Sequence, residues 1–268
     1  MKSKKASAIS TSAAVSLLAL TLVAGCATPP AAGDKEAQAE WVQTNDPAEP
    51  TNRNLHAFNQ GIDDNVLKPM AEGYRDYVPA NFRTNIRNVL TNLSEPLVAA
   101  NDLLQGEFLR AANAIGRFCV NSTFGFLGMG DVAGGGGLEH HDEDFGQTLA
   151  VWGVGEGPYI VLPLLGPSNP RDAVGTAVDF VGNPTNWMIP GLPLAAGVAK
   201  GTVTAVDKRE KYIEPLNEVQ RTSLDYYASL RSLYRQKRAD DIRNGKKGPT
   251  MPAPGLAAMD AEGDKAAH

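Results

Sequence analysis

The side chains best suited to chemistry lie together in one run, His140 to Asp144, which reads His-His-Asp-Glu-Asp. Imidazole and carboxylate groups are the usual protein ligands of zinc and other divalent metals. Ligands on one helix need a spacing of three or four residues, whereas contiguous side chains point apart, and the lone His56 is the nearest further candidate. A solvated loop, with Asp144 near the N-terminus of the next helix, is therefore favoured over a metal site.

A second candidate is the stretch Gly128 to Ala133, which matches the GxGxxA pattern of dinucleotide-binding loops. Such a loop needs a strand before it and a helix after it, so that the helix N-terminus faces the pyrophosphate. Here a helical pattern precedes the stretch and the run Gly134 to Gly137 follows it. We therefore expect these glycines to serve close backbone packing or a turn with positive φ, and no cofactor.

Hydrolase motifs are also incomplete. The nearest approach to GxSxG is Gly166 to Pro170, where proline replaces the final glycine and Ser168 better suits a helix cap. The sequence contains neither HExxH nor a Walker loop. A non-enzyme is favoured, and a lipid hydrolase is the alternative from the enzyme class.

The first 25 residues have the order of a secretory signal: lysines first, then an apolar stretch from Ala13 to Ala24. That stretch ends in Leu-Val-Ala-Gly-Cys, which resembles the lipobox of bacterial lipoproteins, so we expect cleavage before Cys26 and acylation of its thiol. Ala27 resembles the residue found in lipoproteins that are sent on to the outer membrane. The alternative is an ordinary signal peptide followed by a chance cysteine.

Cys119 is the other cysteine, so no disulfide framework is expected once Cys26 is lipidated. Ile115, Phe118 and Cys119 share one helical face. This pattern predicts a small buried apolar residue at Cys119 rather than a reactive thiol.

Composition divides the rest of the chain. Residues 26–45 are small, polar and proline-containing and predict a flexible lipidated tether, residues 46–243 form a helical domain, and residues 244–268 predict a disordered tail. A net charge of −5 argues against nucleic acid as a partner, and 43% apolar residues suffice for a core.

The domain is predicted to be all-α, because apolar residues recur every three or four positions and strong alternation is absent. Pro69 is expected to kink or end the first helix, Ser94 to cap a helix that Gly106 stops, and the run Ser168 to Asp172 to start another. The expected helices cover residues 55–70, 82–93, 94–106, about 14 residues from Phe108, 145–152, 168–181, 195–212 and 216–242.

Residues 183–194 combine three prolines with apolar side chains that a water-exposed loop normally avoids. An apolar, proline-stiffened hairpin is expected of a segment that dips into a bilayer or flexes at a lipid portal, and the alternative is that it folds back into the core. Its candidate lipid-path or gating residues are Trp187, Met188, Ile189, Leu192 and Leu194.

The last predicted helix is basic and carries Arg221, Arg231, Arg235, Lys237 and Arg238. These side chains could meet lipid phosphates through charge-assisted hydrogen bonds. A solvated helix face is the favoured interpretation.

A series of short motifs between residues 46 and 242 is similar to the MlaA (VacJ) family of outer-membrane lipoproteins. The motifs are Asp46-Pro47, Asn52-Arg53, Pro69, Arg75 to Pro79, Asn92-Leu93, Glu95-Pro96, Leu104 to Gly106, Arg117-Phe118, Asn121-Ser122, Asp131 to Ala133, Phe145 to Leu149, Gly157 to Tyr159 and Arg171-Asp172. The chain departs from the family at Pro50-Thr51 and in the run Gly134 to Gly137.

The resemblance implies a ring-like bundle of amphipathic helices that lies in the inner leaflet of the outer membrane, lipid-anchored on the periplasmic side. Members take mislocalised phospholipids from the outer leaflet through an amphipathic channel and pass them to a periplasmic lipid carrier, MlaC, in complexes with trimeric porins. The alternative is a structural porin-associated lipoprotein without a transport role.

The residues support a one-leaflet placement independently. The longest apolar run of the mature chain, Tyr159 to Leu165, is short and interrupted by Pro163, so no single helix is expected to cross a membrane. Several amphipathic helices suit a protein that turns apolar faces to lipid tails and keeps polar groups inside.

Overall fold

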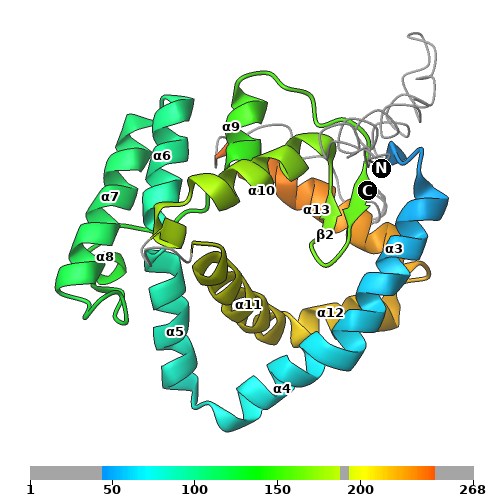
Figure 1. Ribbon diagram of the computed structural model, residues 1–268, viewed down its shortest axis with the longest axis horizontal. Helices are drawn as coiled ribbons and strands as arrows, with labels where there is room; N and C mark the ends of the chain where they lie inside the picture. The colour runs from blue at the N-terminus through cyan, green and yellow to red at the C-terminus, as the bar shows by residue number, and fades with distance from the viewer. Residues whose placement is uncertain (1–43, 188–192, 245–268) are drawn as a thin grey trace, which may run out of the picture.

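The computed structural model describes residues 44–187 and 193–244, and this part of the chain is almost entirely helical (Figure 1). The all-α prediction is confirmed. The helices are α3 (Glu49–Ile62), the π-helical η1 (Asp63–Leu67), α4 (Lys68–Tyr77), α5 (Ala80–Asn92), α6 (Glu95–Gln105), α7 (Phe108–Thr123), α8 (Val132–Gly135), α9 (Phe145–Val151), α10 (Pro170–Gly182), the 3₁₀ turn η2 (Pro184–Trp187), α11 (Pro193–Lys211), α12 (Ile213–Thr222) and α13 (Tyr226–Arg243).

The helices form a ring rather than a filled bundle. Figure 1 shows α3 and α4 passing into α5 and then α6 along the rim, with α11 lying inside this arc. Helix α11 packs against α4 and α5, and α13 packs against α9 and β2. The first and last parts of the domain meet, because Asp46 accepts hydrogen bonds from Tyr227 and Arg231 of α13. No helix of the described residues is long and apolar enough to cross a membrane.

The first helix does not end at Pro69, so one of the two expected outcomes is wrong. The chain stays helical from Glu49 to Tyr77, and the residues before the proline form a π-helical turn in which the Lys68 N–H bonds to the Asp63 carbonyl. Proline lacks an N–H and crowds the preceding turn. The wider π turn is where the helix accommodates this defect.

Helix α6 begins and ends near the expected residues. Gly106 has φ of 79° and terminates the helix in the left-handed conformation that glycine adopts readily. Ser94 holds the N-cap position, but its hydroxyl donates to the Leu90 carbonyl at 3.0 Å rather than bonding the first turn. The capping role predicted for the Ser94 side chain is therefore wrong. Helix α10 is capped by Asn169, which accepts from the Asp172 N–H, and not by Ser168.

A small antiparallel hairpin, β1 (Ile160–Leu162) and β2 (Gly166–Ser168), was not predicted from the sequence. The Asn59 side chain of α3 holds it, because Nδ2 donates to the Leu162 carbonyl at 2.8 Å and Oδ1 accepts from the Leu164 N–H at 2.8 Å. Leu164 at the tip has φ of 65°. Figure 1 shows the hairpin reaching inward from α3.

The helix expected over residues 216–242 is two helices. Helix α12 ends at Thr222, and Asp225 caps α13 by accepting from the Ala228 N–H at 3.2 Å. Aspartate is a strong N-cap residue, so a new helix start competes with continuation through this point. Leu224 is fully exposed in this break.

Candidate functional site

The distribution of side chains across the ring is inverted relative to a water-soluble domain. Among the described residues, buried polar and charged side chains outnumber buried apolar ones. The apolar core is small and divided, with one cluster at Val98, Ala99 and Ala114 and another at Tyr159, Val161 and Tyr227. Since apolar burial is the usual driving force for folding in water, this arrangement indicates a different surrounding medium.

Large apolar side chains are instead exposed. They occur in elements all around the ring and include Phe58, Val66, Met70, Tyr77, Phe82, Leu103, Leu104, Phe108, Leu109, Ile115, Trp152, Val174, Val178, Val181 and Val198. Monomeric soluble proteins rarely expose so continuous an apolar surface, and such patches mark protein or membrane contacts.

Helix α7 shows the inversion most clearly. Its outward face presents Leu109, which is 89% exposed, and Ile115, whereas Arg117 is only 2% exposed on the inward face. Cys119 is exposed, so the prediction that it is a buried apolar residue is wrong. The apolar stripe was identified correctly, but in this helix it faces outward.

Arg117 is the centre of one buried polar cluster. Its Nε donates to Glu95 Oε1 at 2.7 Å, its Nη2 to Asp131 Oδ1 at 3.0 Å, and its Nη1 to the Leu138 carbonyl. The Nδ1 of His140 lies 3.1 Å from the same Glu95 oxygen. These contacts join α6, α7, the α8 cap and the following loop.

The loop His140 to Asp144 is only partly solvated, which corrects that prediction, because the Asp142 side chain is 81% exposed but its neighbours contact α6 and α7. His141 lies 2.8 Å from Asp102 of α6, and Glu143, which is 5% exposed, accepts from Arg110 of α7 at 2.8 Å. Asp144 does cap α9, as expected, by accepting from the Gln147 N–H at 2.9 Å. Within the described ranges, no group of three or more His, Cys, Asp or Glu side chains is arranged to hold a metal ion.

The arginines of α13 are structural, so neither sequence interpretation describes them. Arg231 donates to Asp46 at 2.9 Å, and Arg238 bonds Asp144 and Asp172 at 2.6 to 2.9 Å. Burial raises the pKa of Asp144, but the bonds from Arg238 outweigh it and leave that pKa below its ordinary value. By contrast, Arg221 of α12 is exposed and pairs locally.

A polar cavity of about 460 Å³ lies among these clusters. Residues from α6, α9, β2, α10, α11 and α13 line it, and its walls carry both signs of charge. Lys208 and Lys237 contribute positive charge, while Asp142 and Asp179 contribute carboxylates. Burial raises the pKa of Asp179. A cavity with this lining suits a polar or zwitterionic group rather than a hydrocarbon.

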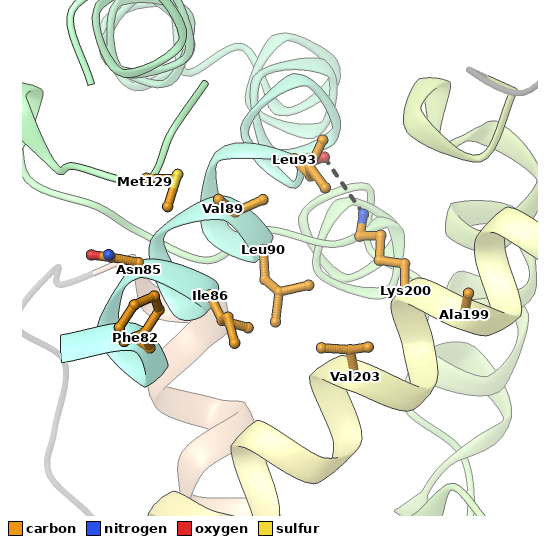
Figure 2. Close-up of a pocket in the computed structure, with 10 residues that line it drawn as sticks. All are labelled: Phe82, Asn85, Ile86, Val89, Leu90, Leu93, Met129, Ala199, Lys200 and Val203. Atoms are coloured by element: carbon orange, nitrogen blue, oxygen red, sulfur yellow. Dashed lines mark hydrogen bonds between the residues drawn. The ribbon is translucent and has the colours of Figure 1, made fainter. Parts of the chain in front are cut away.

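An apolar groove of about 390 Å³ lies between α5 and α11 (Figure 2). Its lining is the stripe expected over residues 82–93 together with Met129, Ala199 and Val203. That stripe therefore faces an open groove and not a closed core. Figure 2 shows the α5 side chains and Val203 of α11 facing each other across it.

Lys200 of α11 is the basic residue of this groove, and sequence reasoning missed it. Its Nζ donates to the Thr185 hydroxyl at 3.1 Å. It also donates to the Leu93 carbonyl at 3.5 Å (Figure 2). No carboxylate of the described residues pairs with it, and burial lowers its pKa. An isolated lysine in the apolar start of α11 was the available signal.

The described structure does not test the residues predicted for the lipid path. Cys26, Met188, Ile189 and Leu192 lie outside the described residues. Trp187 ends η2 and Leu194 lies in the first turn of α11, and the side chains of both are also outside the described part.

The motifs that suggested a family in the sequence supply the buried network. Glu95, Arg117 and Asp131 meet in one cluster, and Asp46 and Asp172 bind the arginines of α13. These polar residues determine how the helices of the ring are joined.

Comparison with known proteins points to the same family as these motifs. The family profile described as MlaA lipoprotein matches residues 44–241. The "Intermembrane phospholipid transport system lipoprotein MlaA" of Haemophilus influenzae is 34% identical over 86% of this chain and 90% of its own length. The protein of the same name from Escherichia coli is 34% identical over 85% and 87%.

One solved structure, described as "Structural basis for maintenance of bacterial outer membrane lipid asymmetry", superimposes with a TM-score of 0.66 at 32% identity. The match covers 74% of this chain and 98% of the other. Together with the buried motifs, these matches show that the chain belongs to the MlaA lipoprotein family.

Proposed function

We propose that this chain is an outer-membrane lipoprotein that removes mislocalised phospholipids from the outer leaflet and so maintains lipid asymmetry. The observation that carries the proposal is the inverted burial pattern of the described residues, in which polar side chains are buried and many large apolar side chains are exposed. The relatives named as phospholipid transport lipoproteins support the same substrate class.

The apolar rim lies among the acyl chains of one leaflet, with Cys26 acylated on the periplasmic side. Leu109 and Phe108 are 89% and 70% exposed, and contact with hydrocarbon removes this area from water. Each buried CH₂ contributes about 0.8 kcal/mol to such transfer. A ring whose described helices do not span the bilayer gains this energy by lying in the leaflet.

The lipid path uses both hollow features. A phospholipid head group passes through the polar cavity, where Lys208 and Lys237 can contact phosphate and carboxylates can contact an amine. The acyl chains follow the apolar groove between α5 and α11, with Lys200 available to the phosphate. One cation beside an apolar wall matches an anionic amphiphile.

The segment from Asn183 to Leu194 remains on the proposed path as a moving portal. Lys200 bonds Thr185 in η2, which places the groove beside the start of this segment. Trp187, Met188, Ile189, Leu192 and Leu194 are its proposed contacts with lipid.

Transport breaks no bond in this proposal. Phospholipid is the misplaced component of the outer leaflet, so its removal can proceed downhill, and a periplasmic carrier of the MlaC kind receives it. Trimeric porins are the proposed membrane partners. No enzymatic activity is proposed.

The test is complementation of outer-leaflet phospholipid in a strain that lacks its own copy, measured by surface labelling. The unaltered protein is expected to lower the label, and Lys200→Glu is expected to lose most of this effect because the groove would repel a phosphate. Lys211→Glu, an exposed lysine of the same helix, is the matched control and should behave like the unaltered protein.

Two outcomes would replace the proposal. If the folded protein reached the membrane and altered porin assembly without changing surface phospholipid, a structural lipoprotein would be the better account. Release of free fatty acid from phospholipid by the purified protein would instead indicate a hydrolase.

A further inference from the structure

The turn between α7 and α8 exposes large apolar side chains in a constrained backbone. Phe124, Phe126 and Leu127 are 78%, 76% and 74% exposed. Phe126 and Leu127 also have φ of 52° and 58°, in the left-handed region that side chains other than glycine, asparagine and aspartate seldom adopt. The turn therefore combines an unfavourable conformation with an unfavourable exposure to water.

The turn is nevertheless held tightly by its backbone. The Gly128 N–H donates to the Asn121 carbonyl at 2.8 Å and the Gly130 N–H to the Gly125 carbonyl at 2.8 Å. Leu127 N–H donates to the Ser122 carbonyl at 3.2 Å. These bonds fix the outward positions of the apolar side chains instead of letting them collapse onto the ring.

Helix α5 holds the turn through side-chain hydrogen bonds. Asn88 donates to the Met129 carbonyl at 2.9 Å, and Asn92 donates to the Ser122 hydroxyl at 2.9 Å. Gly128 has φ of 89°, and a Cβ there would lie 2.7 Å from the Asn92 side chain. This confirms the positive φ and close packing expected of the GxGxxA match at its first glycine, Gly128.

The surroundings of the turn are apolar on the outside. No charged residue occurs from Phe118 to Gly130, and the next one, Asp131, points inward to Arg117 and Asn121. The outward face of α7 leads to the turn through exposed Ile115 and Cys119. Figure 1 places α7 and α8 at the outer edge of the ring.

We propose that residues 124–130 form a preshaped insertion element whose occupant is the hydrocarbon of the leaflet. This rests on the proposed function, which places the ring in that leaflet. Apart from the weak acceptor of Met129, the side chains of the turn offer no hydrogen-bonding group. Protein interfaces usually carry about one hydrogen bond per 100–200 Å², so lipid fits this surface better than a protein partner.

The fixed backbone of the insertion element lowers the entropic cost of entering lipid. A flexible apolar loop loses conformational freedom when it enters lipid, whereas a turn already held open does not. The insertion element therefore sets how deeply the α7 side of the ring lies.

The test uses the full-length lipidated protein, with Cys119→Ser, in vesicles of phosphatidylethanolamine and phosphatidylglycerol. A spin label at Phe126→Cys reports collisions with oxygen, which enriches in hydrocarbon, and with a water-soluble nickel chelate. Control labels are Leu109→Cys on the apolar rim and Arg221→Cys, whose side chain is 74% exposed on α12.

We expect the Phe126 label to meet oxygen more often and nickel less often than the Arg221 label, as the Leu109 label does. If Leu109 reports hydrocarbon but Phe126 reports water, the insertion element is refuted and the proposed function stands. If both report water, the leaflet placement itself fails. Dipolar broadening at Phe126 that grows with protein concentration would overturn the proposal in favour of self-association.

A second variant separates insertion from folding. Phe126→Gly with Leu127→Gly relieves the left-handed strain while removing the apolar side chains. We expect unchanged helicity and a shift of a label at Phe124→Cys toward water. An unchanged depth for that label would also overturn the proposal.

Discussion

The two faces of α7 differ in what they demand of the sequence. The inward face holds Arg117 in bonds whose partners come from three other segments, so each residue has a specific geometric task. The outward face presents Phe108, Leu109 and Ile115 to the surroundings without a fixed partner, so apolar character alone suffices. In this molecule, buried polar contacts therefore determine how the helices are joined, and exposed apolar side chains determine which surroundings the protein prefers.

The largest expected effect comes from breaking the inward face. Arg117→Met leaves Glu95 buried without its arginine, although one Glu95 oxygen already lacks a partner in the described structure. Removing one member of a buried ion pair costs about 3–5 kcal/mol. Chemical unfolding in detergent, followed by circular dichroism, measures the loss, and equal stability of the variant would contradict the comparison.

A transport effect sharpens the contrast next. Lys200→Glu leaves the inward clusters untouched, so the ring should remain folded while removal of outer-leaflet phospholipid is largely lost. The Lys211→Glu control separates a local effect from a general change of charge. Unfolding of the Lys200 variant in detergent would show instead that this lysine belongs to the structural network.

A smaller effect depends on pH. Hydrogen bonds to Asp142 and Glu95 raise the pKa of His140 from 6.5 to about 9. Because the folded pKa is the higher one, the stabilisation is fully present below about pH 6.5 and is lost as pH rises through about 9. His140 is partly exposed, so the contribution is about 1–2 kcal/mol.

The measurement compares His140→Gln with the unaltered protein by unfolding at pH 6 and pH 10. The difference should be largest at pH 6 and should vanish by pH 10. His56→Gln is the control, since burial lowers the pKa of His56 and gives no loss of this sign. A difference that persists at pH 10 would mean that packing rather than charge is responsible.

The smallest effect on folding is expected at the outward face. Leu109→Ser should change unfolding in detergent by less than about 0.5 kcal/mol, because the side chain has no fixed partner. In a Cys26→Ala background, however, the same change should increase extraction of the protein from membranes by urea. Strong destabilisation in detergent would contradict the claim that the inward face of α7 stabilises the fold while its outward face contacts lipid.

Helix positions were predictable from the sequence because the spacing of apolar residues is local information. The direction of each face was not, since a stripe such as Ile115 and Cys119 has the same period whether it faces a core or lipid. Cys119 was misplaced for this reason. Whether an apolar stripe faces the protein core or the surroundings depends on the surrounding medium, and the spacing of apolar residues carries no information about that medium.

The polar clusters could not be assembled from the sequence for a different reason. His141 and Asp102 are 39 positions apart, and Arg238 and Asp144 are 94 apart. Chain separation of this size gives no local pattern, so the run at His140 to Asp144 resembled an isolated loop. The family motifs included other members of these clusters, Glu95, Arg117 and Asp131, but gave no pairing.

The joining of the two ends has a consequence for biogenesis. Asp46 and Tyr227 are 181 positions apart, so this contact has a very high sequence separation and closes late. During synthesis and export, the ring is not yet closed and the apolar faces of the early helices are exposed. Such a state is prone to aggregation. A chain truncated before α13 would therefore yield an open, aggregation-prone arc of helices and not a smaller closed ring.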